Sequence, residues 1–376
     1  MTLKKIAYVL AALAVVAGAW GLYDRFAFGH QNAAYGSYVV WGLWVAMYLF
    51  FASIAAGSLM VATLDLLFNI SIFKGTGKTA LWIGLISLGG ALLSIWLDLG
   101  QLWRIWKVYL QGNLNSVMAQ MVWGYTLLGV LLLASLYFAI RDPQNKILRW
   151  LMIAGLPLSL FVSGAVGALL GVEASRMFWH VGLLPVQFPV FALASGCAAL
   201  LAAIGLFGSS KDANRAQQLR VLGIATIVLA FVKLYFLWAD FSQSIYGNVP
   251  QNVQAVNEVL YGQYAWAFWG LQIALGTVLP IIVLLTPNLA KQGLWAGAMG
   301  VCVLIGFAVA RANIVFPALT IPEIDALTNA FTGPRLQFAY FPSVMEWAVT
   351  TGIVGLVVLA FLIGTDRLPL RGKETA

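Results

Sequence analysis

The sequence has few of the residues that build disulfides, metal centres or haem sites. Its 376 residues include two cysteines, Cys197 and Cys302, which lie inside apolar runs and far apart. Isolated cysteines of this kind are small packing residues and indicate neither a disulfide nor a zinc or iron–sulfur site. There are two histidines, His30 and His180, so a haem held by two histidines would need both. We therefore expect that this chain itself binds no metal, haem or iron–sulfur cluster.

Charged residues are also scarce, and this argues against a soluble fold. They make up 9% of the chain against 62% hydrophobic residues, whereas soluble proteins average about 25% and about 45–50%. One soluble core could not hide so much apolar surface, but lipid can cover it. The sequence also shows no glycine-rich phosphate loop, no metal-ligand spacing and no nucleophile triad. The class that remains is an integral membrane protein.

Ten apolar stretches follow one another along the chain, each near the ~20 residues that a membrane helix needs. We therefore predict an all-α polytopic membrane protein of about ten transmembrane helices, with residues 1–376 forming a single integral membrane domain. The expected helices are Ile6–Leu22, Tyr38–Phe68, Ala80–Asp98, Val117–Ile140, Ile147–Val172, Leu183–Phe207, Leu219–Ala239, Tyr264–Leu285, Leu294–Phe316 and Val344–Ile363.

Basic residues are distributed unequally between the two sides of this arrangement. If the N-terminus is cytoplasmic, cytoplasmic segments hold fourteen of the 21 Lys and Arg residues and outer segments hold five, while Lys233 and Arg311 fall within helices. This distribution follows the positive-inside rule and predicts that both termini are cytoplasmic. The net charge of +8 is therefore a topology signal, and no nucleic-acid partner is expected.

The first apolar stretch has two interpretations. Lys4 and Lys5 precede an Ala-rich apolar run, which is also the pattern of a secretory signal peptide. We favour an uncleaved first helix, because its removal would disturb the alternation of charge between the two sides.

The links on the outer side are longer than those on the cytoplasmic side and rich in Asn, Gln, Tyr, Trp and Pro. They are Gly100–Ser116, Glu173–Gly182, Asp240–Gly262 and Pro317–Phe341. Irregular segments of this length on one face commonly carry function, so we expect an outer surface for a partner subunit. The alternative is a set of loose, solvated loops.

Ionisable residues in or next to the apolar stretches are functional candidates, because a charge in hydrocarbon is costly. They are Asp65, Asp98, Glu173, His180, Lys233, Asp240, Arg311 and Glu346. In the predicted topology Asp65 lies toward the cytoplasm, Lys233 lies near the middle of the membrane, and the others lie toward the outer side. The structural alternative is ion pairing of Asp240 with Lys233 and of Arg311 with Glu346.

The outer group suits a molecule that exchanges protons together with electrons. A quinone head group needs a hydrogen-bond partner at each carbonyl, and at least one partner should titrate near neutral pH. Asp98 and His180 provide a carboxylate and an imidazole on the expected side, and apolar helices would hold an isoprenoid tail. We therefore predict a site for menaquinone or ubiquinone in which Asp98 and His180 handle protons.

Several motifs resemble the NrfD/polysulfide-reductase family of membrane subunits. The aromatic-Gly start and Gly-ending, small-residue stretch of Trp41–Gly57 resemble the family's opening helix. Further similar segments are Leu97–Gln101, Arg104–Trp106, Asn115–Met118, Trp123–Gly124, Phe178–His180, Leu184–Pro185 and Ser195–Gly196. Gln101 and Leu102 stand where the family usually has Arg and Pro. The C-terminal motifs, Arg311–Asn313, Tyr340–Ser343 and Glu346–Trp347, resemble the ten-helix branch found in uptake hydrogenases and sulfur-metabolism complexes.

This resemblance implies a quinone-reactive anchor subunit of a respiratory oxidoreductase in the bacterial inner membrane. Family members exchange electrons between quinone and a ferredoxin-like iron–sulfur subunit at the outer face. That subunit connects to a catalytic subunit, which is a molybdopterin enzyme, a hydrogenase or a multihaem cytochrome. The resemblance also implies two four-helix bundles plus extra helices: helices two to five, about residues 38–172, with the quinone site, and helices six to nine, about residues 183–316.

Roles for further residues follow from their positions in these motifs or in the predicted topology. Trp44 and Tyr48 are expected as the wall of the quinone pocket, and Tyr48 falls where one relative has a quinone-contacting histidine. Arg104 and Asn115 are expected to dock the partner subunit. The residues expected to transfer protons are Asp65, Asp98 and Glu173, and those expected as buried polar groups of the second bundle are Lys233, Asp240, Arg311 and Glu346. For Asp65 the alternative is a helix-end or ion-paired aspartate.

Two other functions remain open at this point. A secondary transporter would bind substrate or ions through charges near the membrane midplane, but most charges of this chain lie away from it. A purely structural anchor would bind no ligand.

Overall fold

The computed structural model describes residues 3–209, 212–331 and 333–370, and these residues form helices joined by links of different lengths. Ten of the described helices are long and apolar enough to cross a membrane, which confirms the predicted all-α, ten-helix class. They are α1 (Leu3–Phe28), α2 (Leu43–Leu66), α3 (Gly77–Asp98), α5 (Val117–Arg141), α6 (Lys146–Gly171), α7 (Leu184–Phe207), α8 (Arg215–Gly247), the π-helical η3 (Ala267–Val278) continued by α10 (Leu279–Leu285), α12 (Gly293–Thr320) and α13 (Val344–Arg367).

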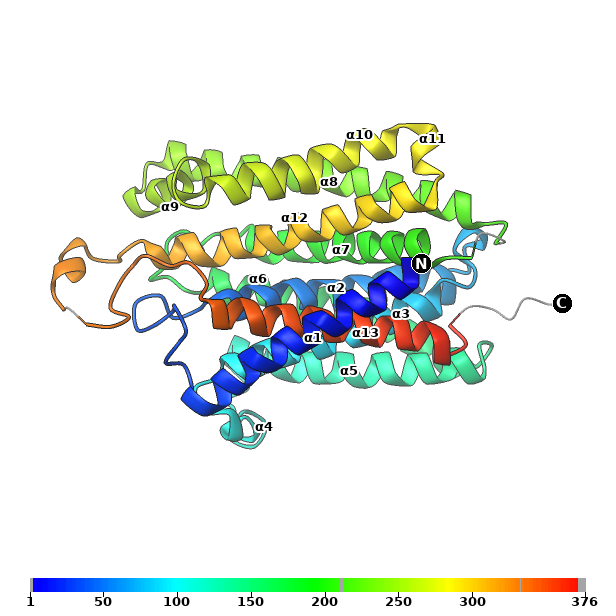
Figure 1. Ribbon diagram of the computed structural model, residues 1–376, viewed down its shortest axis with the longest axis horizontal. Coiled ribbons are helices and arrows are strands. Elements are labelled where there is room, and N and C mark those ends of the chain that lie inside the picture. Colours follow the sequence, from blue (N-terminus) through cyan, green and yellow to red (C-terminus); the bar gives the residue numbers. More distant parts are fainter. Residues whose placement is uncertain (1–2, 210–211, 332, 371–376) are drawn as a thin grey trace.

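Short helical segments occupy the links between the long helices. They are η1 (Ser71–Phe73), η2 (Leu102–Arg104), α4 (Trp106–Leu110), α9 (Pro250–Leu260), α11 (Pro287–Ala290) and η4 (Asp325–Asn329). The long helices run roughly parallel to the longest axis of the molecule (Figure 1).

Helix α2 is the centre of the arrangement. It contacts α3, α6, α7, α12 and α13, and its most apolar stretch is completely buried inside the protein. Helices α2, α3, α5 and α6 contact one another, and a second group is formed by α7, α8, α12 and the η3–α10 helix. Small residues permit the closest approach between the groups, since a Cβ atom on Gly57 of α2 would overlap the carbonyl of Ala192 of α7.

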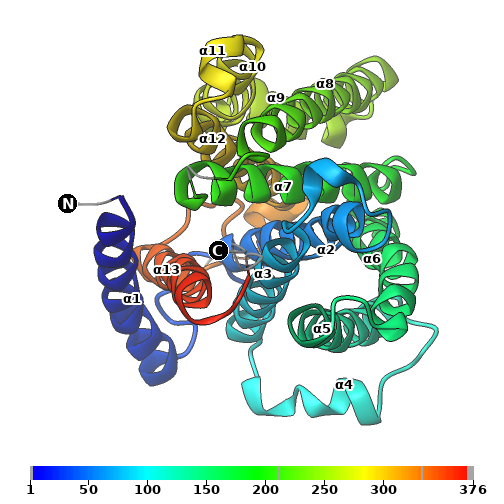
Figure 2. The ribbon, with the colours of Figure 1, turned by 90° about the vertical axis from the view of Figure 1, so that its right-hand side faces the viewer.

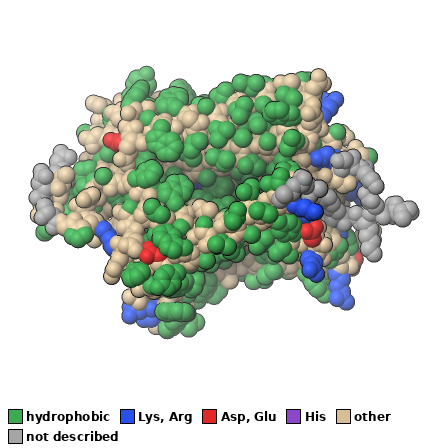
Figure 3. Space-filling model, viewed as in Figure 1, with side chains coloured by type: hydrophobic (Ala, Val, Ile, Leu, Met, Phe, Trp, Pro, Cys, Tyr) green, Lys and Arg blue, Asp and Glu red, His purple; other side chains and the backbone are tan. Residues whose placement is uncertain are grey.

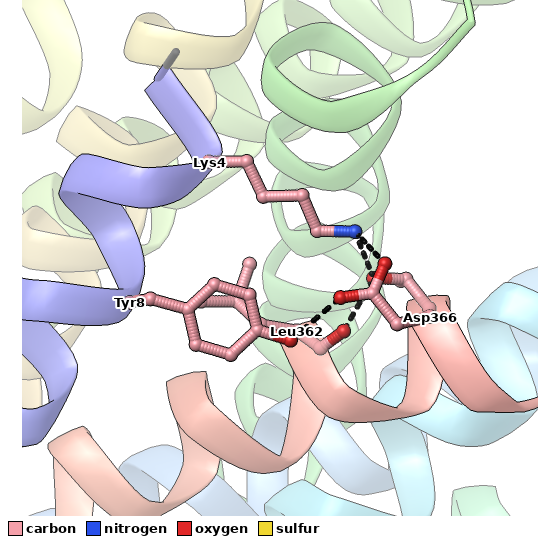
Figure 4. A network of polar contacts seen from close by, with 5 residues as sticks. Lys4, Tyr8, Leu362 and Asp366 are labelled. Atoms are coloured by element: carbon pink, nitrogen blue, oxygen red, sulfur yellow. Dashed lines mark hydrogen bonds and ion pairs between the residues drawn. The ribbon is translucent and has the colours of Figure 1, made fainter. Parts of the chain in front are cut away.

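Helices α1 and α13 form a pair beside α3 (Figure 2). Their backbones meet at Gly18 and Gly352, where a Cβ atom on either residue would overlap the other helix. Figure 4 shows the contact at one end of this pair, where Asp366 accepts hydrogen bonds from Lys4 and from the Tyr8 hydroxyl, the latter at 2.7 Å. The first helix is therefore packed as part of the bundle.

The two ends of the bundle differ in charge and in the length of their links. At one end, which we call the basic end, lie the start of α1, the end of α13 and the α2–α3, α5–α6, α7–α8 and α10–α12 links (Figure 1). Lys and Arg side chains gather at this end, while hydrophobic side chains cover the length between the two ends (Figure 3). This is the end predicted to be cytoplasmic. The opposite end, the loop end, carries α4, α9 and residues 29–42, 172–183, 321–331 and 333–343.

One outer link is more regular than predicted. Residues Asp240–Gly262 were expected to be irregular, but α8 continues to Gly247 and α9 begins at Pro250. The turn between them is made by Asn248, which adopts the left-handed conformation with φ of 52°. Helix α9 buries Ala255, Val256 and Val259 on one face. Its Asn- and Gln-rich composition conceals this amphipathic spacing in a hydropathy scan, so the prediction was wrong.

Candidate functional site

A buried carboxylate joins three segments of the chain at the loop end. Glu346 lies in the first turn of α13, is 0% exposed, and forms a capping box with Ser343. Its carboxylate accepts hydrogen bonds from the Tyr340 hydroxyl at 2.5 Å, the Ala34 amide at 3.0 Å and the Ser343 amide at 2.9 Å. Glu346 therefore fixes the segment before α2 against the start of α13.

The start of α2 is held by the same residues. The Leu43 amide donates to the Tyr340 hydroxyl at 2.7 Å, and the indole of Trp44 donates to the Glu346 carbonyl at 3.2 Å. Tyr264 in turn donates to the Tyr340 carbonyl at 2.8 Å. The position of Trp44, which is 0% exposed, is thereby determined by groups more than 290 residues away in the sequence.

Asp98 is the last residue of α3 and lies beside this region. The free carbonyls at the end of α3 are bound by Arg25 of α1, which donates to Leu97 at 2.9 Å and to Leu99 at 2.8 Å. A cation at a helix C-terminus satisfies unpaired carbonyls and complements the helix dipole. Arg25 is 4% exposed, so α1 contributes a buried positive charge beside Asp98.

His30 and Tyr35, in the link between α1 and α2, complete the group. The Nδ1 atom of His30 lies 2.6 Å from the Tyr35 hydroxyl, which also interacts with the Asp98 carboxyl. The rings of His30 and Tyr35 lie 6.3 and 6.1 Å from that of Trp44, measured between centroids. An imidazole, a phenol and a carboxyl thus form one chain of contacts next to an indole.

The surroundings set the protonation of the two link residues. Burial, followed by the charges of Asp98 and Glu346, raises the pKa of Tyr35 above its usual value, so the phenol keeps its proton. Burial, followed by the charge of Arg25, lowers the pKa of His30, so its imidazole is neutral at pH 7. Neutral imidazole has one nitrogen that donates a hydrogen bond and one that accepts.

Two buried polar atoms of this group have no hydrogen-bond partner within the described part of the chain. They are Oδ1 of Asp98 and Nε2 of His30. The Leu99 backbone also lies near the His30 ring, without the geometry of a full hydrogen bond. An unsatisfied buried polar atom costs free energy, and in a native structure it often marks a ligand or water position. We call Arg25, His30, Tyr35, Trp44, Asp98 and Glu346 the Asp98 cluster. It can accept and donate hydrogen bonds to a small polar group and can transfer a proton.

The residues predicted as the quinone site are only partly brought together. Trp44 and Asp98 lie in the Asp98 cluster. Tyr48 lies one turn further along α2, is 5% exposed, and places its hydroxyl 3.5 Å from the sulfur of Met121. His180 is exposed in the loop after α6, where its Nδ1 atom lies 2.8 Å from the Gly171 carbonyl. The polar groups around Asp98 are Tyr35, Arg25 and Glu346 rather than His180.

The other candidates at the loop end are more accessible. Glu173 is half-buried in the same loop as His180. Arg104 and Asn115 are exposed on either side of α4. The large apolar side chains of this segment are also exposed, including Trp103 and Leu110, at 78% each. These positions suit contact with another molecule more than a buried ligand.

Asp65 lies at the basic end, and its carboxylate is hydrogen-bonded to backbone amides. Its Oδ2 atom accepts hydrogen bonds from the Gly75 amide at 3.0 Å and the Gly77 amide at 2.8 Å. It thereby satisfies free amides at the start of α3. This geometry favours the helix-end alternative for Asp65.

The buried charges of the second group do not form the expected ion pairs. The ion pairs within the described residues are Lys4–Asp366 and Arg176–Glu323. Lys233 donates to the Thr277 hydroxyl at 3.1 Å, and Arg311 donates to the Ser53 hydroxyl at 2.8 Å.

Aromatic rings and hydroxyls therefore take the place of carboxylates around these two cations. The Arg311 guanidinium lies 4.0 Å from the ring centre of Phe188. The oxygens of Glu346 are bound at the loop end, and no ion pair joins Lys233 to Asp240 within the described residues, which corrects both ion-pair alternatives. Asp240 is half-buried in α8.

Sequence reasoning missed Arg25, His30 and Tyr35. They lie at the end of the first helix and in the link after it, and nothing in their local pattern connects them to Asp98. One signal was available, because His30 is one of two histidines and falls on the outer side in the predicted topology. Within the described residues no group of three or more His, Cys, Asp and Glu side chains is placed to hold a metal ion.

Comparison with known proteins gives a consistent match. Residues 31–323 match the family described as "Polysulphide reductase, NrfD". The chain is 29% identical to a selenate reductase subunit of Mesobacillus selenatarsenatis, over 99% of this chain and 96% of that protein. It is 26% identical to the Hdr-like menaquinol oxidoreductase integral membrane subunit of Archaeoglobus fulgidus, over 88% and 85% of the two chains. It is 24% identical to the menaquinone reductase integral membrane subunit of Nitratidesulfovibrio vulgaris, over 94% and 90%.

Proposed function

This chain belongs to the polysulphide reductase NrfD family, and we propose that it is the quinone-reactive membrane subunit of a respiratory oxidoreductase complex. Two of its relatives are named as menaquinol or menaquinone oxidoreductase membrane subunits, which supports menaquinone as the quinone. The observation that carries the proposal is the pair of unpartnered buried atoms, Oδ1 of Asp98 and Nε2 of His30, beside the Trp44 indole.

These atoms fit both redox forms of a quinone head group. A quinone carbonyl accepts a hydrogen bond, and a quinol hydroxyl donates one. If Tyr35 donates to Nδ1 of His30, the Nε2 atom carries the hydrogen and can donate to a carbonyl. If Tyr35 donates to Asp98, Nδ1 donates to Tyr35 and Nε2 accepts from a hydroxyl. Rotation of the Tyr35 hydroxyl, together with the change of His30 from the Nε2–H to the Nδ1–H tautomer, exchanges the two states.

The same chain of contacts can carry a proton. Oxidation of a quinol releases two electrons and two protons. His30 takes one proton at Nε2 and gives the proton of Nδ1 to the Tyr35 oxygen, and Tyr35 gives its own proton to Asp98. The second proton leaves toward Glu173 and His180 at the surface of the loop end. Arg25 keeps a positive charge next to the carboxyl and fixes the end of α3. The electrons pass to a partner subunit.

Other residues have supporting roles in this proposal. Trp44 forms a wall beside the head group, and Tyr48, one turn deeper along α2, lines the path of the apolar tail. His180 and Glu173, near the surface of the loop end, pass released protons outward. Lys233, Arg311 and Asp240 lie outside the site.

The loop end is the surface for the partner that receives electrons. It holds the Asp98 cluster and exposes Arg104, Asn115 and several large apolar side chains. We propose that a ferredoxin-like iron–sulfur subunit binds here and connects to a catalytic subunit, a molybdopterin enzyme, a hydrogenase or a multihaem cytochrome. Relatives named as subunits of reductases are consistent with such a complex.

A binding titration tests this proposal. A fluorescent quinol analogue is added to the purified chain, and saturable quenching is compared among wild type, Asp98→Asn, His30→Ala and His180→Ala. Loss of a hydrogen bond to a charged or buried group costs about 1–3 kcal/mol, so Asp98→Asn and His30→Ala should weaken binding by about 5-fold to about 150-fold. His180→Ala should bind as wild type does.

Asp142→Asn is the matched control, because Asp142 is an exposed carboxylate in the α5–α6 link at the basic end. Weaker binding in His180→Ala with unchanged binding in His30→Ala would move the site to the α6–α7 loop. Unchanged binding in both Asp98→Asn and His30→Ala would remove the Asp98 cluster from quinone binding.

A further inference from the structure

A cavity of about 1040 Å³ opens at the basic end, far from the Asp98 cluster. It lies among the α2–α3 link, the end of α7, the start of α8 and the end of α13, where these elements face the viewer in Figure 2. Its charged lining residues are Asp65, Lys74, Lys78, Asp212 and Arg215. Ligand pockets in proteins measure about 300–1,000 Å³, so this volume admits a group much larger than a small ion.

The carboxylates of the cavity already accept hydrogen bonds from backbone amides. Asp65 accepts the hydrogen bonds of the Gly75 and Gly77 amides. Oδ1 of Asp212 accepts from the Asn214 amide at 3.0 Å. Both carboxylates therefore act in local backbone structure at the cavity wall.

The basic side chains of the cavity form fewer contacts with the rest of the protein, and none of them forms an ion pair within the described residues. Arg215 binds the Ile204 and Gly205 carbonyls at 3.3 and 2.8 Å through Nε and Nη2. Lys74 is exposed and Lys78 is half-buried, and neither forms an ion pair within the described part of the chain. Three cations thus line one cavity, and its two carboxylates already accept hydrogen bonds from backbone amides. The cavity therefore suits an anion.

The turn that carries Lys74 is fixed in place. Gly75 adopts φ of 86°, and the Thr76 hydroxyl donates to the Phe73 carbonyl at 2.7 Å. Gln218 of α8, which is 1% exposed, donates to the Ile72 carbonyl at 2.9 Å. The α2–α3 link is thereby attached to the start of α8, and the basic side chains project from a rigid wall.

The rest of the lining is apolar. Leu66, Ile204, Phe361 and Leu370 come from the ends of α2 and α7 and from α13 and the segment after it. A ligand here would have a charged part near Lys74 and an apolar part near these side chains. The position at the end of the membrane-spanning helices places the cavity at the level of the lipid head groups.

We propose that this cavity binds the phosphate head group of an anionic phospholipid from the leaflet at the basic end. Lys74, Lys78 and Arg215 contact the phosphate, and the apolar residues contact the start of an acyl chain. Basic pockets between transmembrane helices on the cytoplasmic side are suited to such head groups. The site is separate from the quinone site, and its test does not depend on the proposed function.

The test uses the full chain in neutral detergent and measures lipid binding by native mass spectrometry. Phosphatidylglycerol, phosphatidylcholine and inorganic phosphate are added in parallel to wild type and to Lys74→Gln/Lys78→Gln. Each basic residue near an anionic head group strengthens binding by about fivefold, so the double variant should bind phosphatidylglycerol about 30-fold more weakly. Arg215 is left intact because it satisfies the end of α7.

The matched control is Lys146→Gln/Arg149→Gln, at the start of α6, which removes two basic residues of the same end that do not line the cavity. Wild-type affinity in this control, with weak binding of phosphatidylcholine, supports the proposal. If both double variants lost phosphatidylglycerol affinity equally, general surface charge would explain the binding, and the proposed cavity site would be wrong. Full competition by inorganic phosphate at lipid concentrations would assign the site to free phosphate instead. Unfolding of Lys74→Gln/Lys78→Gln in a denaturing detergent, followed by tryptophan fluorescence and unchanged from wild type, verifies folding.

Discussion

Replacing Glu346 by Gln should destabilise the loop end, because no orientation of an amide satisfies every donor that the carboxylate satisfies. One oxygen accepts from the Tyr340 hydroxyl and, at 3.4 Å, from the Leu43 amide, and the other accepts from the Ala34 and Ser343 amides. An amide nitrogen beside Ala34 and Ser343 would place donors against donors. An amide nitrogen beside Tyr340 leaves the Tyr340 hydroxyl hydrogen without its acceptor.

The second orientation is the less costly one, since it strands one buried donor instead of two. An unsatisfied buried donor costs about 1–3 kcal/mol, so Glu346→Gln should lower the free energy of unfolding by that amount. Glu346→Ala removes the acceptor of the Tyr340, Ala34 and Ser343 donors and should cost about 3–9 kcal/mol by the same reasoning.

The assay is unfolding of the purified chain by increasing mole fractions of a denaturing detergent, followed by tryptophan fluorescence. Glu323→Gln is the matched control, because Glu323 is partly exposed and forms one ion pair with Arg176 at 3.1 Å. An exposed ion pair contributes about 0.2–1 kcal/mol. If Glu346→Gln were no less stable than Glu323→Gln, the carboxylate would not hold these segments together.

Two further predictions concern His30 and Asp65. Because the pKa of His30 is lower in the folded chain than the usual value of about 6.5, its contribution to stability is complete above about pH 6.5 and lost as the pH falls through the folded value. Unfolding compared at pH 7.5 and about pH 5 should show a smaller acid loss in His30→Gln, and equal losses would contradict the burial of this imidazole. Asp65→Asn keeps an oxygen that can accept from Gly75 and Gly77, so quinone-linked turnover of the assembled complex should stay within about twofold of wild type. A large loss of turnover in a folded Asp65→Asn complex would restore Asp65 as a proton-transfer residue.

The membrane helices could be predicted from the sequence because their signal is local. Twenty or so consecutive apolar residues identify a membrane span whatever surrounds it. The signal fails where a helix leaves the apolar layer, as at α8 beyond Ala239 and at α9, since polar composition there conceals the amphipathic spacing.

The candidate site was only partly predictable because its contacts are not local. Asp98 was identified because a charge in a membrane helix is costly to bury, and Trp44 was identified from its position in a family motif. Their neighbours depend on how α1 and α13 pack beside α3, and no single-sequence pattern records that packing. Asp98 and His180 were predicted to act together only because both fall on the outer side of the membrane. The actual neighbours of Asp98, Arg25 and Tyr35, come from α1 and the link after it.

The position of the quinone can be measured directly with a photoreactive quinone analogue that carries its reactive group on the head group. The purified chain is illuminated with the analogue, digested, and mapped by mass spectrometry, with excess menaquinone as competitor. We expect competed labelling within residues 25–44 and at the end of α3 around Asp98, and its loss in Asp98→Asn. Competed labelling confined to α7, α8 and α12, near Lys233 and Arg311, would contradict a quinone site at the Asp98 cluster.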